Sequence, residues 1–328
     1  MMYDLIAIGD SMQDIFVELK EAEILTDTKH MKLNLCVTFA DKIPAEHIEF
    51  QVAGNSANAA VGATRLGLRC AFYTVIGDDA AGKMIRDKME DEGVAGRYIV
   101  TDKGKMNNYS VVLTYQGERT IILYHQTRHY QLPKLLKVPW VYFSSLGNHN
   151  PSFLKLHDNV LEYIHSSTAK LAFNPGTYQL RMPIPLLRKV ISKSHILFVN
   201  VQEAQRILGA QDKINIKNLL FQLGAFGPKI VVITDGSNGA YAYQGNHSFY
   251  HIEIFPSQLV ERTGAGDSFA IAFLAALAFN HDVPTALRWG AINSASVVSK
   301  VGPQPGLLRK AEILAILRKH PGFQAKKI

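Results

Sequence analysis

Cysteine is scarce in this chain of 328 residues, which contains only Cys36 and Cys70. Both lie in apolar or strand-like surroundings, and no Cys-x-x-Cys pair or Cys/His cluster exists, which excludes a disulfide framework and a zinc finger. We therefore expect two buried free thiols in a reducing compartment.

Long hydrophobic runs are also absent. The longest run, residues 268–279, is well short of the roughly 20 apolar residues that span a membrane. The chain starts without a basic segment followed by an apolar core, which a signal peptide requires. These absences predict a cytoplasmic protein without a membrane partner.

The charge pattern lacks any strongly basic stripe. The formal net charge of +7 is spread along the chain, and basic residues do not alternate with aromatic residues. Nucleic acid is therefore not an expected partner, whereas anionic small molecules are compatible with this charge. Residues 319–328 hold three lysines and are expected to fray.

What the chain does contain is typical of a globular α/β protein. Its hydrophobic content is 47%, and it has 24 glycines and 13 prolines. From Trp140 onward, short apolar strands alternate with helices, which predicts a doubly wound, mostly parallel sheet. Ligands of such sheets bind past the carboxyl ends of the strands. The residues expected to converge there are Asp14, Asn200, Thr234 and the turn at 263–267.

A second group of strands has a different pattern. Residues 16–19 and 33–37 read as strands of a small sheet outside the main domain. Residues 109–115 and 119–124 flank a three-residue turn and predict a hairpin. The chain therefore combines one large sheet with a smaller one.

The strongest local signal is the sequence TGAGD at residues 263–267, which opens an Ala- and Leu-rich helix. A helix start offers backbone N–H groups and the positive end of the helix dipole, and Gly264 and Gly266 let a ligand approach closely. Such a site suits a phosphate oxyanion. Asp267 would repel that phosphate unless it takes a proton from an attacking hydroxyl. The alternative is a simple helix cap on a tight turn.

Residues 77–84 resemble a phosphate-binding P-loop, because a glycine-rich turn follows a strand and opens a helix. The last position of that motif must offer a hydroxyl to Mg²⁺, and here it is Met84. An ordinary strand–turn–helix is the favoured interpretation, with a P-loop ATPase kept as a rival class.

Other polar positions have a structural and a functional interpretation. Asn200 and Glu203 can hold the water shell of a Mg²⁺ or can form a capping box, and taken alone the capping box is favoured. Residues 234–239 can form a hairpin turn. Asp14 can be an ordinary turn carboxylate, and Gly54 and Asn58 can simply allow close helix packing.

Taken together, two stretches resemble the ribokinase family of sugar and nucleoside kinases, also called the phosphofructokinase-B family. One runs from AGNSANA at residues 53–59 to residues 76–82 and 92–94, and the other is TGAGDSF at residues 263–269. The resemblance extends from Leu5 to Gly302.

The resemblance implies a role for each matching residue. It implies ATP and Mg²⁺ as cofactors, with Asp267 as catalytic base. Gly264, Ala265 and Gly266 form the anion hole. Asp14, Gly54 and Asn58 hold sugar hydroxyls, and Met12, Gln13 and Asn55 lie in the same loops. Asn200 and Glu203 lie near the phosphates and Mg²⁺, with Glu203 acting through water. Thr234, Gly236 and Gly239 lie beside the nucleotide. Asn293 lies near the adenine.

The resemblance also implies a domain division. Residues 1–14, 51–97 and 126–328 form the main domain, which binds substrate and nucleotide. Residues 15–50 and 98–125 form a β lid that covers the sugar and makes a homodimer contact.

Two positions depart from the family pattern. The family usually has Asp two residues before the TGAGD run, where it helps to hold a monovalent cation, but this chain has Glu261 followed by Arg262. Because Glu keeps the carboxylate, we expect an altered K⁺ site and modest K⁺ activation at best. Ribokinase places a Glu after its central strand to touch the sugar, and residues 145–147 (Ser-Leu-Gly) stand there instead, which argues against ribose.

The sequence therefore predicts an ATP-dependent kinase that acts on a primary hydroxyl of a small sugar. A neutral sugar is favoured over a nucleoside, because the predicted lid hairpin offers no clear aromatic clamp for a base. Tyr109, Tyr115 and Tyr124 are the candidates there, and aromatic residues of strands more often pack than stack on ligands. The alternatives are a nucleoside kinase of the same family and a catalytically silent sugar- or nucleotide-binding regulator.

Overall fold

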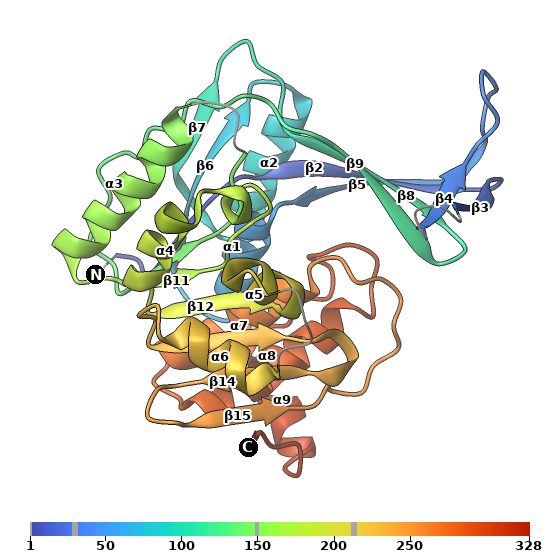
Figure 1. Ribbon diagram of the computed structural model, residues 1–328. Coiled ribbons are helices and arrows are strands. Elements are labelled where there is room, and N and C mark those ends of the chain that lie inside the picture. Colours follow the sequence, from blue (N-terminus) through green and yellow to red (C-terminus); the bar gives the residue numbers. More distant parts are fainter. Residues whose placement is uncertain (1, 28–31, 148–150, 211–214) are drawn as a thin grey trace.

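The computed structural model describes residues 2–27, 32–147, 151–210 and 215–328. A ten-stranded sheet runs through the body in the order β16-β15-β14-β13-β12-β11-β10-β1-β6-β7 (Figure 1). Strands β7 to β13 of this order are parallel, and β14, β15 and β16 continue it antiparallel. The strands are β1 (Leu5–Ile8), β6 (Cys70–Gly77), β7 (Ala95–Asp102), β10 (Trp140–Phe143), β11 (Lys170–Phe173), β12 (Ile196–Asn200), β13 (Ile230–Thr234), β14 (Ala240–Tyr243), β15 (Phe249–Ile252) and β16 (Lys326–Lys327).

Helices cover both faces of this sheet, so the expected doubly wound α/β fold is confirmed. Successive side chains of a strand point to opposite faces, which is why Leu5 and Ala7 join one hydrophobic core while Ile6 and Ile8 join the other. The first core is closed by α1 (Asn55–Arg65), α2 (Ala80–Asp91), α7 (Ala265–Ala278), α8 (Val283–Val297) and α9 (Lys310–Lys319). The second is closed by α3 (Ser152–Ser167), α4 (Ile184–Lys193), α5 (Val201–Leu208) and α6 (Ile216–Gly224).

A four-stranded sheet projects from one side of the body (Figure 1). Its order is β5 (Ala45–Ala53), β2 (Met12–Leu19), β8 (Tyr109–Tyr115) and β9 (Glu118–Tyr124), and β8 and β9 form the expected hairpin. At its far end β3 (Glu23–Asp27) pairs with β4 (Lys32–Cys36). We call the four-stranded sheet the small sheet.

The strand bounds differ from the expected lid range at several points. Residues 98–102 belong to β7, which pairs with β6 in the large sheet, because β7 continues the parallel ladder beyond α2. Strand β2 begins at Met12 and β5 runs to Ala53, so the first part of the small sheet extends at both ends into the expected main domain. Residues 28–31 of the expected lid lie outside the described residues.

Two smaller expectations need correction. Cys70 is buried, but Cys36 is partly exposed because β4 belongs to the projecting pair of strands. The end of the chain is ordered, since residues 326–327 pair with β15 and extend the large sheet. Among the described helices, none has both the length and the apolar character needed to cross a membrane.

Helix α7 lies in the middle of the first core and is buried from Asp267 to Ala276, as its apolar sequence predicts. Helix α1 packs against it closely. A Cβ on Gly62 would come within 2.8 Å of Ile271 Cγ2, so only glycine permits this approach. The close packing brings polar residues from the first turns of the two helices together at one edge of the sheet.

Candidate active site

Two cavities meet at the carboxyl edge of the large sheet. The first, of about 650 Å³, lies between the small sheet and the main body, and the second, of about 590 Å³, lies between the β13–β14 turn and α8. The residues that line both cavities are Asn200, Thr234, Arg262, Ala265, Gly266 and Phe269. The start of α7 is therefore the point where ligands in the two cavities would meet.

The backbone at the start of α7 needs glycine. Gly264 has a φ of +79°, and a Cβ there would lie 2.5 Å from Pro303 Cβ. At Gly266, by contrast, a Cβ would meet no heavy atom within 4 Å, because this residue faces the open space of both cavities. A negatively charged group can thus come close to the N–H groups of the first turn.

Asp267 in that first turn is buried, with 8% of its surface exposed. Burial raises the pKa of its carboxyl to about 6, opposed by the hydrogen bond from Asn58 and reinforced by the charge of Glu203. Asn58 Nδ2 donates to Asp267 Oδ2 at 2.9 Å, and Asn58 Oδ1 accepts from Gln304 Nε2 at 3.1 Å. Asp267 is thus a fixed carboxylate whose pKa suits acceptance of a proton near neutrality.

Asp14 supplies a second carboxylate to the first cavity. Burial raises its pKa to about 7, although a hydrogen bond from Ser110 opposes the shift. Within the described residues Asp14 Oδ1 has no hydrogen-bond partner, so it can accept from a ligand hydroxyl. Met12, Gly54, Asn55 and Asn58 line the same cavity.

Asn200 and Glu203 form the capping box at the start of α5. Asn200 Oδ1 accepts from Glu203 N and Glu203 Oε2 accepts from Asn200 N, both at 2.8 Å. Burial raises the pKa of Glu203, and these hydrogen bonds oppose the shift. Asn200 and Glu203 therefore form a capping box, and because both also line the first cavity they can in addition face the water shell of a Mg²⁺.

A family model described as pfkB family carbohydrate kinase matches residues 20–310. The chain belongs to this family. Among curated relatives, the 5-dehydro-2-deoxygluconokinase of Shouchella clausii is 25% identical over 288 residues, covering 81% of this chain and 86% of that protein. The ribokinase of Bacillus subtilis is 27% identical over 269 residues, covering 80% and 87%. The protein is thus a carbohydrate kinase.

Solved structures share the fold of this pfkB kinase. Arabidopsis thaliana ribokinase, described as complexed with ribose and ATP, has a TM-score of 0.80 at 22% identity and covers 97% of this chain and 99% of its own. A Methanocaldococcus jannaschii nucleoside kinase has a TM-score of 0.76 at 18% identity, with the same coverage.

The β13–β14 turn of the pfkB kinase lines the second cavity with Thr234, Gly236 and Gly239. It is also a hairpin turn, and a Cβ on Gly239 would lie 2.0 Å from the Ile252 carbonyl oxygen. Asn293 on α8 does not line this cavity, although its neighbours Ala291 and Ser294 do. It is fully buried, its Nδ2 donates to Ser268 O at 2.8 Å, and its Oδ1 accepts from Leu308 N at 2.9 Å.

Asn293 therefore ties α8 to α7 and does not line either cavity. Gln13 also lies outside both cavities, because its side chain points to Met84 Sδ at 3.6 Å. The P-loop-like segment contributes none of residues 77–84 to either cavity. Its turn instead binds the chain that leads to β8, since Gly77 N donates to Asn107 Oδ1 at 3.1 Å.

Several lining residues of the pfkB kinase were not anticipated from its sequence. They are Asp10, Ser110, Arg119, His125, Asn174, Tyr178 and Arg181. Asp10 follows the buried strand β1 after a single glycine, Gly9, and that position was a usable signal. Arg119 and His125 lie on or beside an exposed hairpin strand, where the sequence gives no hint of a ligand site.

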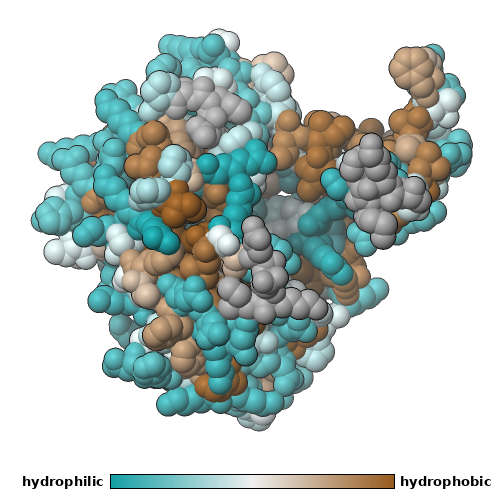
Figure 2. Space-filling view, in the orientation of Figure 1, coloured by the Kyte–Doolittle hydropathy of each residue, from teal (hydrophilic) through white to brown (hydrophobic). Residues whose placement is uncertain are grey.

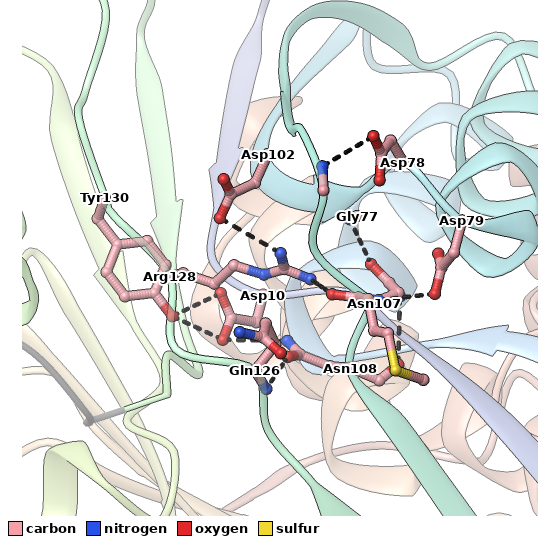
Figure 3. Close-up of polar contacts among 12 residues, drawn as sticks. Asp10, Gly77, Asp78, Asp79, Asp102, Asn107, Asn108, Gln126, Arg128 and Tyr130 are labelled. Carbon is pink, nitrogen blue, oxygen red and sulfur yellow. Dashed lines mark hydrogen bonds and ion pairs between the residues drawn. The ribbon is translucent and has the colours of Figure 1, made fainter.

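Asp10 belongs to a buried cluster behind the first cavity (Figure 3). Tyr130 O–H donates to Asp10 at 2.8 Å, and Gly147 N donates to Asp10 Oδ2 at 2.8 Å. Asn108 joins the cluster by accepting from Gln126 N at 2.9 Å. Because residues 107–108 lead into β8 and residues 125–130 follow β9, this cluster fixes the stem of the small sheet to the body.

Proposed function

We propose that this carbohydrate kinase transfers the γ-phosphoryl group of ATP to a primary hydroxyl of a small sugar, with Asp267 as the general base. The observation that carries the proposal is the position of Asp267, which lines the first cavity in the turn of α7 that the two cavities share. The first cavity would hold the sugar and the second the nucleotide.

Each lining residue then has a chemical task. Asp267 orients the acceptor hydroxyl and takes its proton late, while the N–H groups of residues 264–266 stabilise the charge on the transferring phosphoryl group. Asp14 accepts hydrogen bonds from sugar hydroxyls. The small sheet acts as the lid that keeps water from the reaction, since Ser110, Ile121 and Leu123 form part of the cavity wall.

The residues near the point where the two cavities meet fit a nucleotide-bound Mg²⁺. Glu203 uses only Oε2 in the capping box, so Oε1 can accept from the water shell of the ion. In the described ranges no group of three acidic, cysteine or histidine side chains could hold a metal ion by itself, so ATP phosphates would supply the direct ligands. When bound, Mg²⁺ neutralises phosphate charge. A structural neighbour from Escherichia coli, described as in complex with ATP and Mg²⁺, supports the assignment.

The tyrosines of the small sheet do not favour a nucleoside as the acceptor. Tyr109 and Tyr124 use their hydroxyls on Asp79 and Gln126, and neither they nor Tyr115 line the cavity. No tyrosine of the small sheet is therefore placed to stack on a base.

We expect ATP consumption that depends on an added sugar. The measurement is a coupled assay over ribose, fructose, keto-deoxygluconate, hexose phosphates and nucleosides. ATP hydrolysis independent of every acceptor would favour the ATPase class, and ATP binding without turnover would favour a silent regulator. Efficient phosphorylation of adenosine, with no reaction on any sugar, would overturn the choice of a sugar.

We also propose that a second copy of the chain covers the small sheet. Figure 2 shows hydrophobic side chains gathered where this sheet projects. Exposed residues on the face turned away from the first cavity include Ile48 and Phe50 on β5 and Ile122 on β9, so both edge strands contribute to it. Such edges are prone to pair with another chain.

A homodimer is therefore expected in sedimentation velocity, and Ile122→Lys should convert it to a monomer, because a charge on the covered face is costly to bury. The matched control is Lys137→Ile, which alters charge on the main body. A parent protein that sediments as a monomer at every concentration would contradict this contact.

A further inference from the structure

Arg119 joins the small sheet to the loop that precedes the anion-binding turn. From β9 its guanidinium donates to Thr263 Oγ1 at 2.7 Å and forms an ion pair with Glu261. The Arg119 side chain is 31% exposed and that of Glu261 is 9% exposed. Because Thr263 directly precedes Gly264, the guanidinium lies beside the start of α7.

The carboxylate of Glu261 is already occupied by donors from the protein. Its Oε1 accepts from Arg119, from Thr263 N at 2.8 Å and from the Thr263 hydroxyl, while Oε2 accepts from Gly302 N at 3.1 Å. This donor set does not fit a monovalent-cation ligand, because its four hydrogen bonds already match the roughly four lone-pair sites that a carboxylate offers.

We propose that Arg119 is a positioning residue for phosphoryl transfer, and that its guanidinium supplies the fixed positive charge which makes a monovalent cation unnecessary beside the anion-binding turn. This inference rests on the proposed kinase function. The charge comes from the small sheet, so the anion-binding turn is complete only when that sheet lies over the first cavity. The contact therefore couples closure over the sugar to completion of the catalytic turn.

The electrostatic reason lies in the position of Glu261. A carboxylate four residues before Ala265 repels an incoming phosphate unless a nearby cation compensates it. Arg119 provides that compensation and also holds the Thr263 side chain. Removing one partner of such a pair leaves an uncompensated, nearly buried charge, which is costly. A mobile cation would then be able to take the vacant place.

The test compares turnover in K⁺ with turnover in a bulky organic cation such as tetramethylammonium. The parent should change by less than about twofold between the two salts, because its compensating charge is covalently attached. Arg119→Met, which keeps most of the side-chain stem, should lose about 10- to 100-fold in tetramethylammonium, the usual effect of removing a charged hydrogen-bond partner. K⁺ should restore a large part of this loss.

Two further variants separate positioning from a merely structural role. Arg119→Lys should retain most activity without K⁺, and Arg119→Met combined with Glu261→Gln should recover turnover and lose the K⁺ response, since no charge then needs compensation. Arg97→Met on β7, outside both cavities, serves as the control for loss of an arginine.

Strong K⁺ activation of the parent would overturn the inference, as would an Arg119→Met variant that is fully active or that is impaired without any response to K⁺. If the parent consumes no ATP with any sugar, the proposed function fails instead. The parent assay therefore distinguishes the two failures.

Discussion

Asp267→Asn is expected to lower turnover by about 10²–10⁴-fold, the usual contribution of a positioned general base. Asp267 does not cap α7, whose N-cap is Gly264. Asparagine has nearly the same shape and its amide oxygen still accepts the hydrogen bond from Asn58. It cannot accept the proton of the sugar hydroxyl. ATP affinity should persist or increase, because one negative charge near the γ-phosphate is removed. The measurements are sugar-dependent turnover, ATP titration and thermal unfolding.

The pH dependence gives a second readout of the same prediction. Burial raises the pKa of Asp267 to about 6, so at saturating sugar the turnover of the parent should fall as the pH drops through about 6 and the base becomes protonated. The Asn variant should lose this dependence.

The free energy of unfolding should change with pH in the opposite direction to turnover: it should fall as the pH rises. The charged carboxylate is disfavoured in the fold, so its cost is full above about pH 6 and absent below the unfolded value of 3.8. The Asn variant should therefore be as stable as the parent or slightly more stable at neutral pH. A folded variant with near-normal turnover would contradict the proposed mechanism.

The fold was predictable because its strands are short and apolar and alternate with helices. Strand β1 and the helix after Asp267 illustrate this, since apolar residues in every position mark elements covered on all sides. The bounds of the small sheet were less predictable. The sequence of β7 resembles that of the neighbouring strands, and only its pairing with β6 assigns it to the large sheet.

The site was predictable where a motif sets the backbone, and unpredictable where a contact joins distant segments. Gly264, Gly266 and Asp267 follow from the demands of a helix start that approaches an anion. The Arg119–Glu261 pair spans 142 residues, and nothing local to either residue indicates it. Asn293 shows a related limit: an Asn inside a helix near a site reads like a ligand contact, but its polar atoms hold α7 and the segment after α8 together.

Gly264→Ala is expected to impair both stability and turnover. Its φ of +79° disfavours a side chain, and the new Cβ would lie 2.5 Å from Pro303 Cβ and 2.7 Å from Pro303 Cα. The strain should lower the free energy of unfolding by about 1–3 kcal/mol. Relief of that strain would reorient the first N–H groups of α7, and loss of one such donor typically lowers turnover by about 10²–10³-fold.

Gly266→Ala is the matched control, because it obstructs the approach of the ligand to the turn without straining the backbone. A Cβ at this position meets no heavy atom within 4 Å, and alanine favours a helix over glycine by roughly 1 kcal/mol, so stability should be kept or improved. Turnover should still fall, because the methyl group would occupy the space that both cavities share. Urea unfolding and sugar-dependent turnover measure the two effects separately. If Gly266→Ala were stable and fully active, the phosphoryl group would not approach this turn, and the start of α7 would lose its assignment as the anion hole.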